Sequence, residues 1–125
     1  MSEKDLLLEK ARKFLLEASR DKNFGCYNKG ISSLWFAIEH FLKLILLKEK
    51  GSYPKRIGRM LSLTTQEIKK KGGNIIIVKY LREIYNARKN VDHSTLIVSE
   101  ELCNKFFKKG NKVLEALSRL FGISL

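Results

Sequence analysis

Apolar residues recur along most of this chain at spacings of three and four, the period of a helix that buries one face. A first stripe predicts a helix over residues 3–20, with Ser2 as its N-cap. A second, wider stripe predicts a central core helix over residues 26–50, which Gly51 ends. The stripe positions are Leu7, Ala11, Phe14 and Ala18 in the first helix, and Ile31, Leu34, Trp35, Ile38, Phe41, Leu42, Ile45 and Leu46 in the second.

The second half of the chain repeats the pattern in three further segments. Residues 57–71 form a weaker helix, which a cap at Thr64 or Thr65 would divide into two pieces. A helix then starts after the N-cap Asn74, and the segment from Asn90 interrupts it. Ser99 caps a last helix, whose stripe is Leu102, Phe106, Val113, Leu117 and Leu120. We therefore predict an all-α fold, with residues 1–125 as one domain.

Charge is the strongest bias in the composition. The chain carries 25 basic and 13 acidic residues, a formal net charge of +12. This excess favours polyanionic partners, namely RNA, DNA or an acidic protein. A lysine-rich surface that only solvates the fold would give the same composition, so charge alone does not separate these alternatives.

Several classes of site are disfavoured by the sequence. Cys26 and Cys103, the two cysteines, are 77 positions apart in apolar surroundings, and we expect buried free thiols. No Cys-x-x-Cys pair and no glycine-rich phosphate loop occurs, so we predict neither a metal site nor a cofactor. The opening MSEKDLLLEK is charged rather than signal-like, and Lys43 interrupts the longest apolar run. The expected location is the cytoplasm, without membrane contact.

The segment NARKNVDHST, residues 86–95, holds the most concentrated candidate chemistry. The apolar stripe that precedes it continues onto Arg88, and a buried arginine needs a carboxylate partner or a cleft. His93 follows five residues later, near the helix end. A guanidinium can hold a phosphate, and an imidazole can move the proton of an attacking hydroxyl. Such a pair could cleave RNA without a metal. Alternatively, the segment is a polar helix exit in which Asp92 simply pairs with Arg88 or Lys89.

The chain as a whole resembles HEPN domains, small helical domains of prokaryotic toxin and defence systems. Their motif is an arginine, four to six residues, then a histidine at a late helix end, and RKNVDH matches it with Arg88 and His93. The first two predicted helices and the YPK connection also resemble the family. The resemblance implies an antiparallel bundle of about four to five helices that forms a homodimer, in which two Arg-His motifs meet in a cleft.

The resemblance also implies a function. Active members are metal-independent endoribonucleases, so Arg88 would stabilise the phosphate and His93 would act as general acid and base, with Asn90 and Asp92 orienting the imidazole. The alternative is a non-catalytic module that binds a nucleotidyltransferase-type antitoxin, a nucleotide or nucleic acid. His40 is a weaker site candidate, because a helix histidine is more often structural. We predict that Trp35, Phe36 and Phe41 pack in the core.

Overall fold

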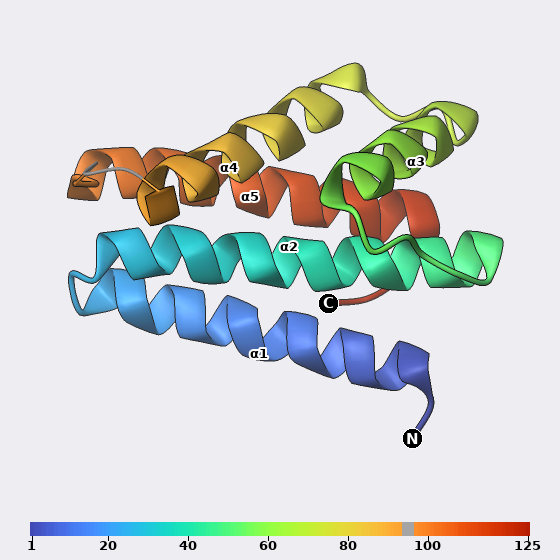
Figure 1. Cartoon of the computed structure of the whole chain (residues 1–125), viewed down its shortest axis with the longest axis horizontal. Coiled ribbons are helices and arrows are strands. Elements are labelled where there is room, and N and C mark those ends of the chain that lie inside the picture. The colour runs from blue at the N-terminus through green and yellow to red at the C-terminus, as the bar shows by residue number, and fades with distance from the viewer. Residues whose placement is uncertain (94–96) are drawn as a thin grey trace.

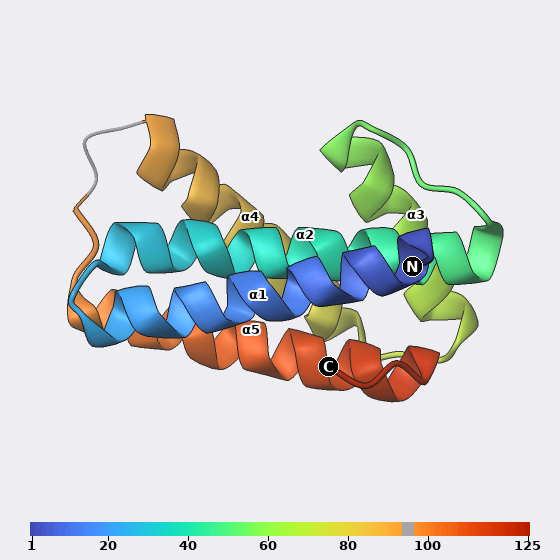
Figure 2. The ribbon, with the colours of Figure 1, turned by 90° about the horizontal axis from the view of Figure 1, so that it is seen from below.

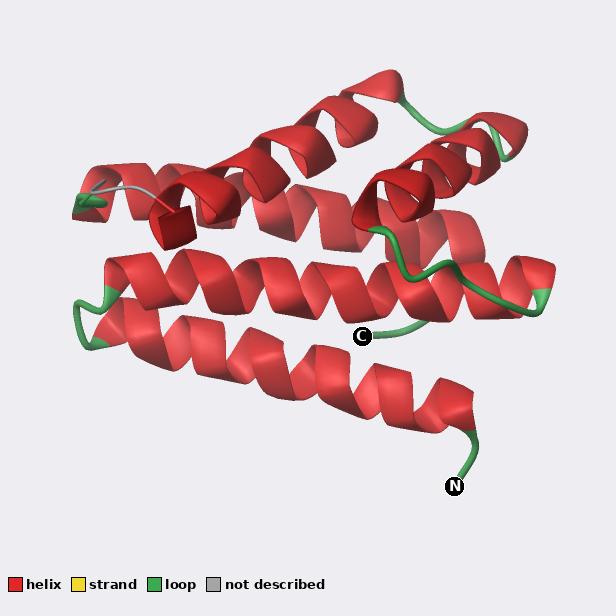
Figure 3. Ribbon diagram, viewed as in Figure 1, coloured by secondary structure: helices red, strands yellow, loops and turns green. Residues whose placement is uncertain are grey.

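The computed structural model describes residues 1–93 and 97–125; the side chain of His93 lies outside this part. Within these residues the chain forms helices only, as Figure 3 shows, which confirms the all-α prediction. The helices of the described residues are α1 (Glu3–Asn23), α2 (Tyr27–Lys50), α3 (Ile57–Lys70), α4 (Ile75–His93) and α5 (Glu100–Phe121).

Helix α2 lies at the centre of the bundle. Helix α1 runs antiparallel along one side of α2, while α4 and α5 form a second antiparallel pair on its other side (Figures 1 and 2). The shorter α3 packs near the C-terminal end of α2. This arrangement is the antiparallel bundle that the family resemblance implied. It brings the turn between α1 and α2 and the C-terminal end of α4 to the same end of the molecule.

The core is built around α2, as its stripe predicted. All eight predicted stripe residues of α2 are fully buried. Helix α2 is long and apolar enough to cross a membrane by length and composition alone. The presence of Lys43 therefore does not by itself exclude a membrane-spanning segment. However, 61% of the most apolar window of α2 is buried against other parts of the bundle. Most of this window therefore packs inside the bundle, as expected for a core helix.

Local capping explains where the helices begin and end. Ser2 and Asp5 form a capping box at α1, and the Ser99 side chain accepts a hydrogen bond from the Leu102 amide at the start of α5. Gly51 ends α2 with φ of 80°, a left-handed conformation that suits glycine. These caps lie where the sequence predicted them.

Other predictions about single elements were only partly correct. Helix α3 is continuous, as the predicted range indicated, and the alternative of two pieces is wrong. The Thr64 and Thr65 hydroxyls donate to carbonyls one turn back and cap no second helix. Helix α4 does not stop at Asn90 but continues to His93. Cys103 is buried as expected, whereas Cys26 precedes α2 and is exposed. The buried face of α5 was also only partly predicted: it is Cys103, Phe107, Gly110, Val113, Leu114, Leu117 and Phe121.

Candidate functional site

The candidate site is built on the C-terminal turns of α4. Ile77, Leu81 and Ile84 bury one side of this helix against the core. The same stripe reaches Arg88, five residues before α4 ends at His93. The C-terminal turns of α4 pass beside the N-terminal half of α2 (Figure 1). Arg88 therefore continues the core-facing stripe, as its spacing in the sequence predicted, and the structure shows that it faces α2.

Two contacts orient the Arg88 side chain. Its guanidinium carbon lies 5.2 Å from the centre of the Phe36 ring on α2, a cation–π distance. Its Nε lies 2.8 Å from Oδ2 of Asp92. The N–H does not point at this oxygen, and Nε has no hydrogen-bond partner among the described residues. The contact with Asp92 is therefore an ion pair. The side chain of Arg88 remains 23% exposed, so the cation is oriented without being fully enclosed.

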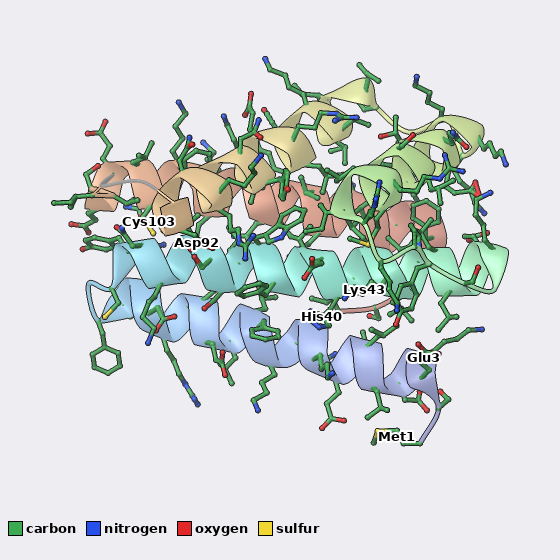
Figure 4. The ribbon with its side chains drawn as sticks, in the orientation of Figure 1. Met1, Glu3, His40, Lys43, Asp92 and Cys103 are labelled. Atoms are coloured by element: carbon green, nitrogen blue, oxygen red, sulfur yellow. The ribbon has the colours of Figure 1, made fainter. Side chains whose placement is uncertain are left out.

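Asp92 connects α4 to α2. Its Oδ2 faces Arg88, while its Oδ1 accepts a hydrogen bond of 3.0 Å from the Ser32 hydroxyl. Figure 4 shows Asp92 where the end of α4 approaches α2. The sequence suggested that Asp92 orients the imidazole, and equally that it pairs with Arg88. The contacts of the described residues agree with the second role, because both carboxylate oxygens are engaged by Arg88 and Ser32.

Asn90 lies away from this cluster. Two residues of helix rotate a side chain by about 200°, so Asn90 and Arg88 leave α4 on nearly opposite sides. Asn90 lines a hollow between α4 and α5 that contains neither Arg88 nor Asp92. The structure thus brings Arg88 and Asp92 together and places Asn90 elsewhere. His93 is the last residue of α4, and its side chain lies outside the described part of the chain.

Aromatic rings extend from Arg88 along the junction of α1 and α2. The Phe36 ring lies 5.4 Å from Phe14, and the Phe14 ring stacks on His40 at 5.2 Å. The Nδ1 atom of His40 lies 2.7 Å from the Phe36 carbonyl oxygen, so this nitrogen is the protonated one if it donates there. Figure 4 shows His40 between α1 and α2, farther along α2 than Asp92.

One of the three aromatic residues predicted to pack in the core has a different environment. Trp35 and Phe41 are fully buried, as predicted. Phe36 is only half-buried and supports the guanidinium of Arg88, a role that the sequence analysis missed. The available signal was the spacing: Ser32 and Phe36 are one turn apart on α2, like Arg88 and Asp92 on α4.

No group of three or more histidine, cysteine, aspartate or glutamate side chains that could hold a metal occurs among the residues that the structure describes. The groups brought together here are instead a cation, a carboxylate, a hydroxyl and an aromatic face. This arrangement can hold the guanidinium in one orientation at the end of α4.

Comparison with known proteins identifies the family. The model of the HEPN domain matches residues 5–120, which include all of the site residues. The chain belongs to the HEPN domain family. It is also similar to a protein of Methanocaldococcus jannaschii named "Putative toxin MJ0142", with 24% identity over 110 residues. That alignment covers 87% of this chain and 75% of the relative.

The Arg88-to-His93 segment lies inside the part of the chain that matches the HEPN domain. The matched region includes α4 and most of α5, so the RKNVDH motif lies within the domain rather than in an appended tail. In this HEPN domain the motif spans the last turns of one helix. Its arginine is already paired and stacked within one chain.

Proposed function

We propose that this HEPN domain is a metal-independent endoribonuclease that acts as a cytoplasmic homodimer in a toxin–antitoxin or defence setting. The observation that carries the proposal is the oriented, partly exposed Arg88 guanidinium on the helix that ends with His93. Family membership and the name of the archaeal relative support the setting. The net charge of +12 suits a polyanionic substrate.

In the proposed reaction, a ribose 2′-hydroxyl attacks the adjacent phosphorus. The new 2′-O–P bond forms as the bond to the 5′-oxygen breaks, which leaves a 2′,3′-cyclic phosphate and a 5′-hydroxyl. His93 takes the proton of the attacking hydroxyl, and an imidazolium returns a proton to the leaving oxygen. Arg88 binds the non-bridging oxygens and stabilises the charge that grows on them.

Arg88 is suited to this role because its orientation is set before substrate arrives. The Phe36 ring supports one face of the guanidinium, and Asp92 lies beside Nε. A phosphate could then approach the partly exposed cation without a large loss of side-chain entropy. The carboxylate of Asp92 opposes an incoming phosphate, so its benefit would lie in orientation rather than in affinity.

The test is cleavage of RNA in the presence of EDTA. We expect the unaltered protein to produce 2′,3′-cyclic phosphate ends, and His93→Ala to lower kcat by about 100-fold or more. Arg88→Lys should also lose most activity, because an ammonium lacks the planar fork. Size-exclusion chromatography with light scattering checks that each variant keeps the unaltered oligomeric state. Equal cleavage by the His93→Ala protein would refute the proposed mechanism.

A second candidate is a non-catalytic HEPN module that binds a nucleotidyltransferase-type partner, a nucleotide or nucleic acid. The contacts that favour it are those of Asp92 with Arg88 and Ser32, which would also serve as a clamp between α4 and α2. In that case Arg88→Ala would lower stability by about 1 kcal/mol, while no RNA would be cut with or without EDTA. Chemical denaturation and the cleavage assay together separate the two candidates.

A further inference from the structure

A second polar surface lies on the other side of α4, where this helix faces α5. Figure 2 shows the two helices diverging toward the end of α4, and a hollow of about 340 Å³ lies between them. We call this surface the α4–α5 hollow. Its polar and aromatic lining consists of Glu83, Asn86 and Asn90 from α4, and Lys105, Phe106 and Lys109 from α5.

The lining of the α4–α5 hollow carries one more positive than negative charge. Glu83 is its one carboxylate, and Lys109 donates to it over 2.5 Å. The pKa of Glu83 is lowered, first by this hydrogen bond and also by the charges of Lys109, Lys79 and Lys105. The lining therefore holds two lysines and one carboxylate. Because Lys109 is paired with Glu83, Lys105 is the lysine of the lining that remains for an anionic ligand.

The other groups of the hollow suit nucleobases better than the carboxylates of an acidic protein. Asn86 is exposed and offers both a donor and an acceptor, the pair that a base edge requires. Phe106 is half-buried and contributes an aromatic ring to the lining. An aromatic face can stack on any base, whereas it adds little to the binding of an acidic peptide.

The dimensions of the hollow suit a short strand. Glu83 and Asn90 are seven residues apart, roughly 10 Å along the helix axis. A stacked strand advances about 3.4 Å per nucleotide, so about three nucleotides would lie along this length. The hollow of about 340 Å³ would enclose only part of them. Its far end at Asn90 is less than one helical turn before His93. A strand leaving the hollow would therefore pass around the end of α4 that carries the proposed catalytic motif.

We propose that the α4–α5 hollow binds single-stranded RNA beside the cleavage site, with Lys105 contacting phosphate and Asn86 and Phe106 contacting bases. The identification of the polymer as RNA rests on the proposed function. The hollow itself contains neither Arg88 nor Asp92, so binding and cleavage can be measured separately.

The binding test uses the full chain carrying His93→Ala and a fluorescently labelled single-stranded RNA of about 12 nucleotides, in EDTA and at low salt. Lys105→Glu in this background should raise Kd about fivefold or more and reduce the salt dependence. Lys13→Glu is the matched control, because Lys13 is an exposed lysine on α1 and the charge change is identical. It should alter Kd less than about twofold. Circular dichroism verifies that both variants stay folded.

An uncharged substitution provides a second measurement. Asn86→Ala should weaken binding of the same RNA by about threefold or more without changing the salt dependence, since it removes no charge. Equal weakening by Lys105→Glu and Lys13→Glu, or no effect of Asn86→Ala, would mean that only the bulk charge attracts RNA and would overturn the inference. Binding of poly-glutamate to the hollow in preference to RNA would overturn it in favour of an acidic partner.

Cleavage data distinguish failure of this inference from failure of the proposed function. In a chain with His93 intact, Lys105→Glu should raise KM and leave kcat nearly unchanged. Cleavage whose KM is insensitive to Lys105→Glu would reject the hollow while leaving the ribonuclease in place. RNA binding that depends on Lys105 and Asn86 in a protein that cuts nothing would support the hollow and reject the ribonuclease.

Discussion

At the scale of single residues, the main feature is an arginine at a position where an apolar stripe would ordinarily continue. Arg88 is accommodated because the flat guanidinium lies over Phe36 and its Nε lies beside the Asp92 carboxylate. The sequence alone indicated that Arg88 needed a carboxylate partner or a cleft, and it named Asp92 as one candidate. It did not reveal the contributions of Phe36 and Ser32, because these come from α2, more than fifty positions away.

The role of Asp92 can be tested by separating orientation from charge. Asp92→Asn keeps the shape of the side chain but removes the anion that holds Arg88 and repels phosphate. We expect kcat for RNA cleavage to fall about tenfold through loss of orientation, while KM stays level or falls. Steady-state kinetics over a range of RNA concentrations measures both constants.

Ser32→Ala is the companion variant for the same question. It removes the hydroxyl that ties Asp92 to α2 but leaves the carboxylate beside Arg88. We expect a smaller decrease in kcat in the same direction. An unchanged kcat in both variants, or a KM that rises in Asp92→Asn, would show that Asp92 does not position the arginine.

At the scale of elements, helices with a wide apolar stripe and clear caps were predictable. The limits of α2 were predicted to within one residue, because an uninterrupted stripe ends at Gly51. The buried side of α5 was harder to predict, because two neighbouring sets of apolar residues on this helix recur with the same helical spacing. Small residues such as Gly110 carry no hydrophobic signal, although Gly110 lies where α5 packs closely against Leu34 of α2. Similarly, the polar residues at the end of α4 have the composition of a loop, yet they are helical as far as His93. In this last turn Asp92 is hydrogen-bonded to Ser32 of α2, a contact that the local sequence does not reveal.

The contact between α5 and α2 leads to a stability prediction. A Cβ atom at position 110 would lie 2.9 Å from a methyl carbon of Leu34, which is fully buried and has little room to move. We expect Gly110→Ala to destabilise the protein by about 1–3 kcal/mol despite the better helix propensity of alanine. Urea denaturation followed by circular dichroism measures the change.

Gly58→Ala is the matched control for this substitution. Gly58 lies in the first turn of α3, and an added Cβ would meet no described atom within 4 Å. Without a steric cost, alanine should stabilise the protein by about 0.5 kcal/mol. If both substitutions changed the free energy of unfolding in the same direction, the close approach of α5 to α2 would not be the cause.

At the scale of the whole molecule, the number of histidines limits the proton-transfer steps that one chain can catalyse. The sequence contains two histidines, His40 and His93. The ring of His40 stacks on Phe14, and its Nδ1 faces the carbonyl of Phe36. The proposed reaction needs one group to accept a proton and another to donate one. A second copy of the chain would supply the missing partner as a second His93, which is the physical reason for proposing a homodimer.

This requirement for two copies can be measured by mixing subunits. His93→Ala chains are combined with unaltered chains, unfolded and refolded together, and exchange is verified by native mass spectrometry. If one active site needs His93 from both copies, only dimers of two unaltered chains cut RNA, so activity falls with the square of the unaltered fraction. An equal mixture would then retain about one quarter of the activity of the same total amount of unaltered protein. A linear decrease, to about one half, would mean that each chain carries a complete site, and the second proton-transfer group would have to be sought within the same chain, starting with His40.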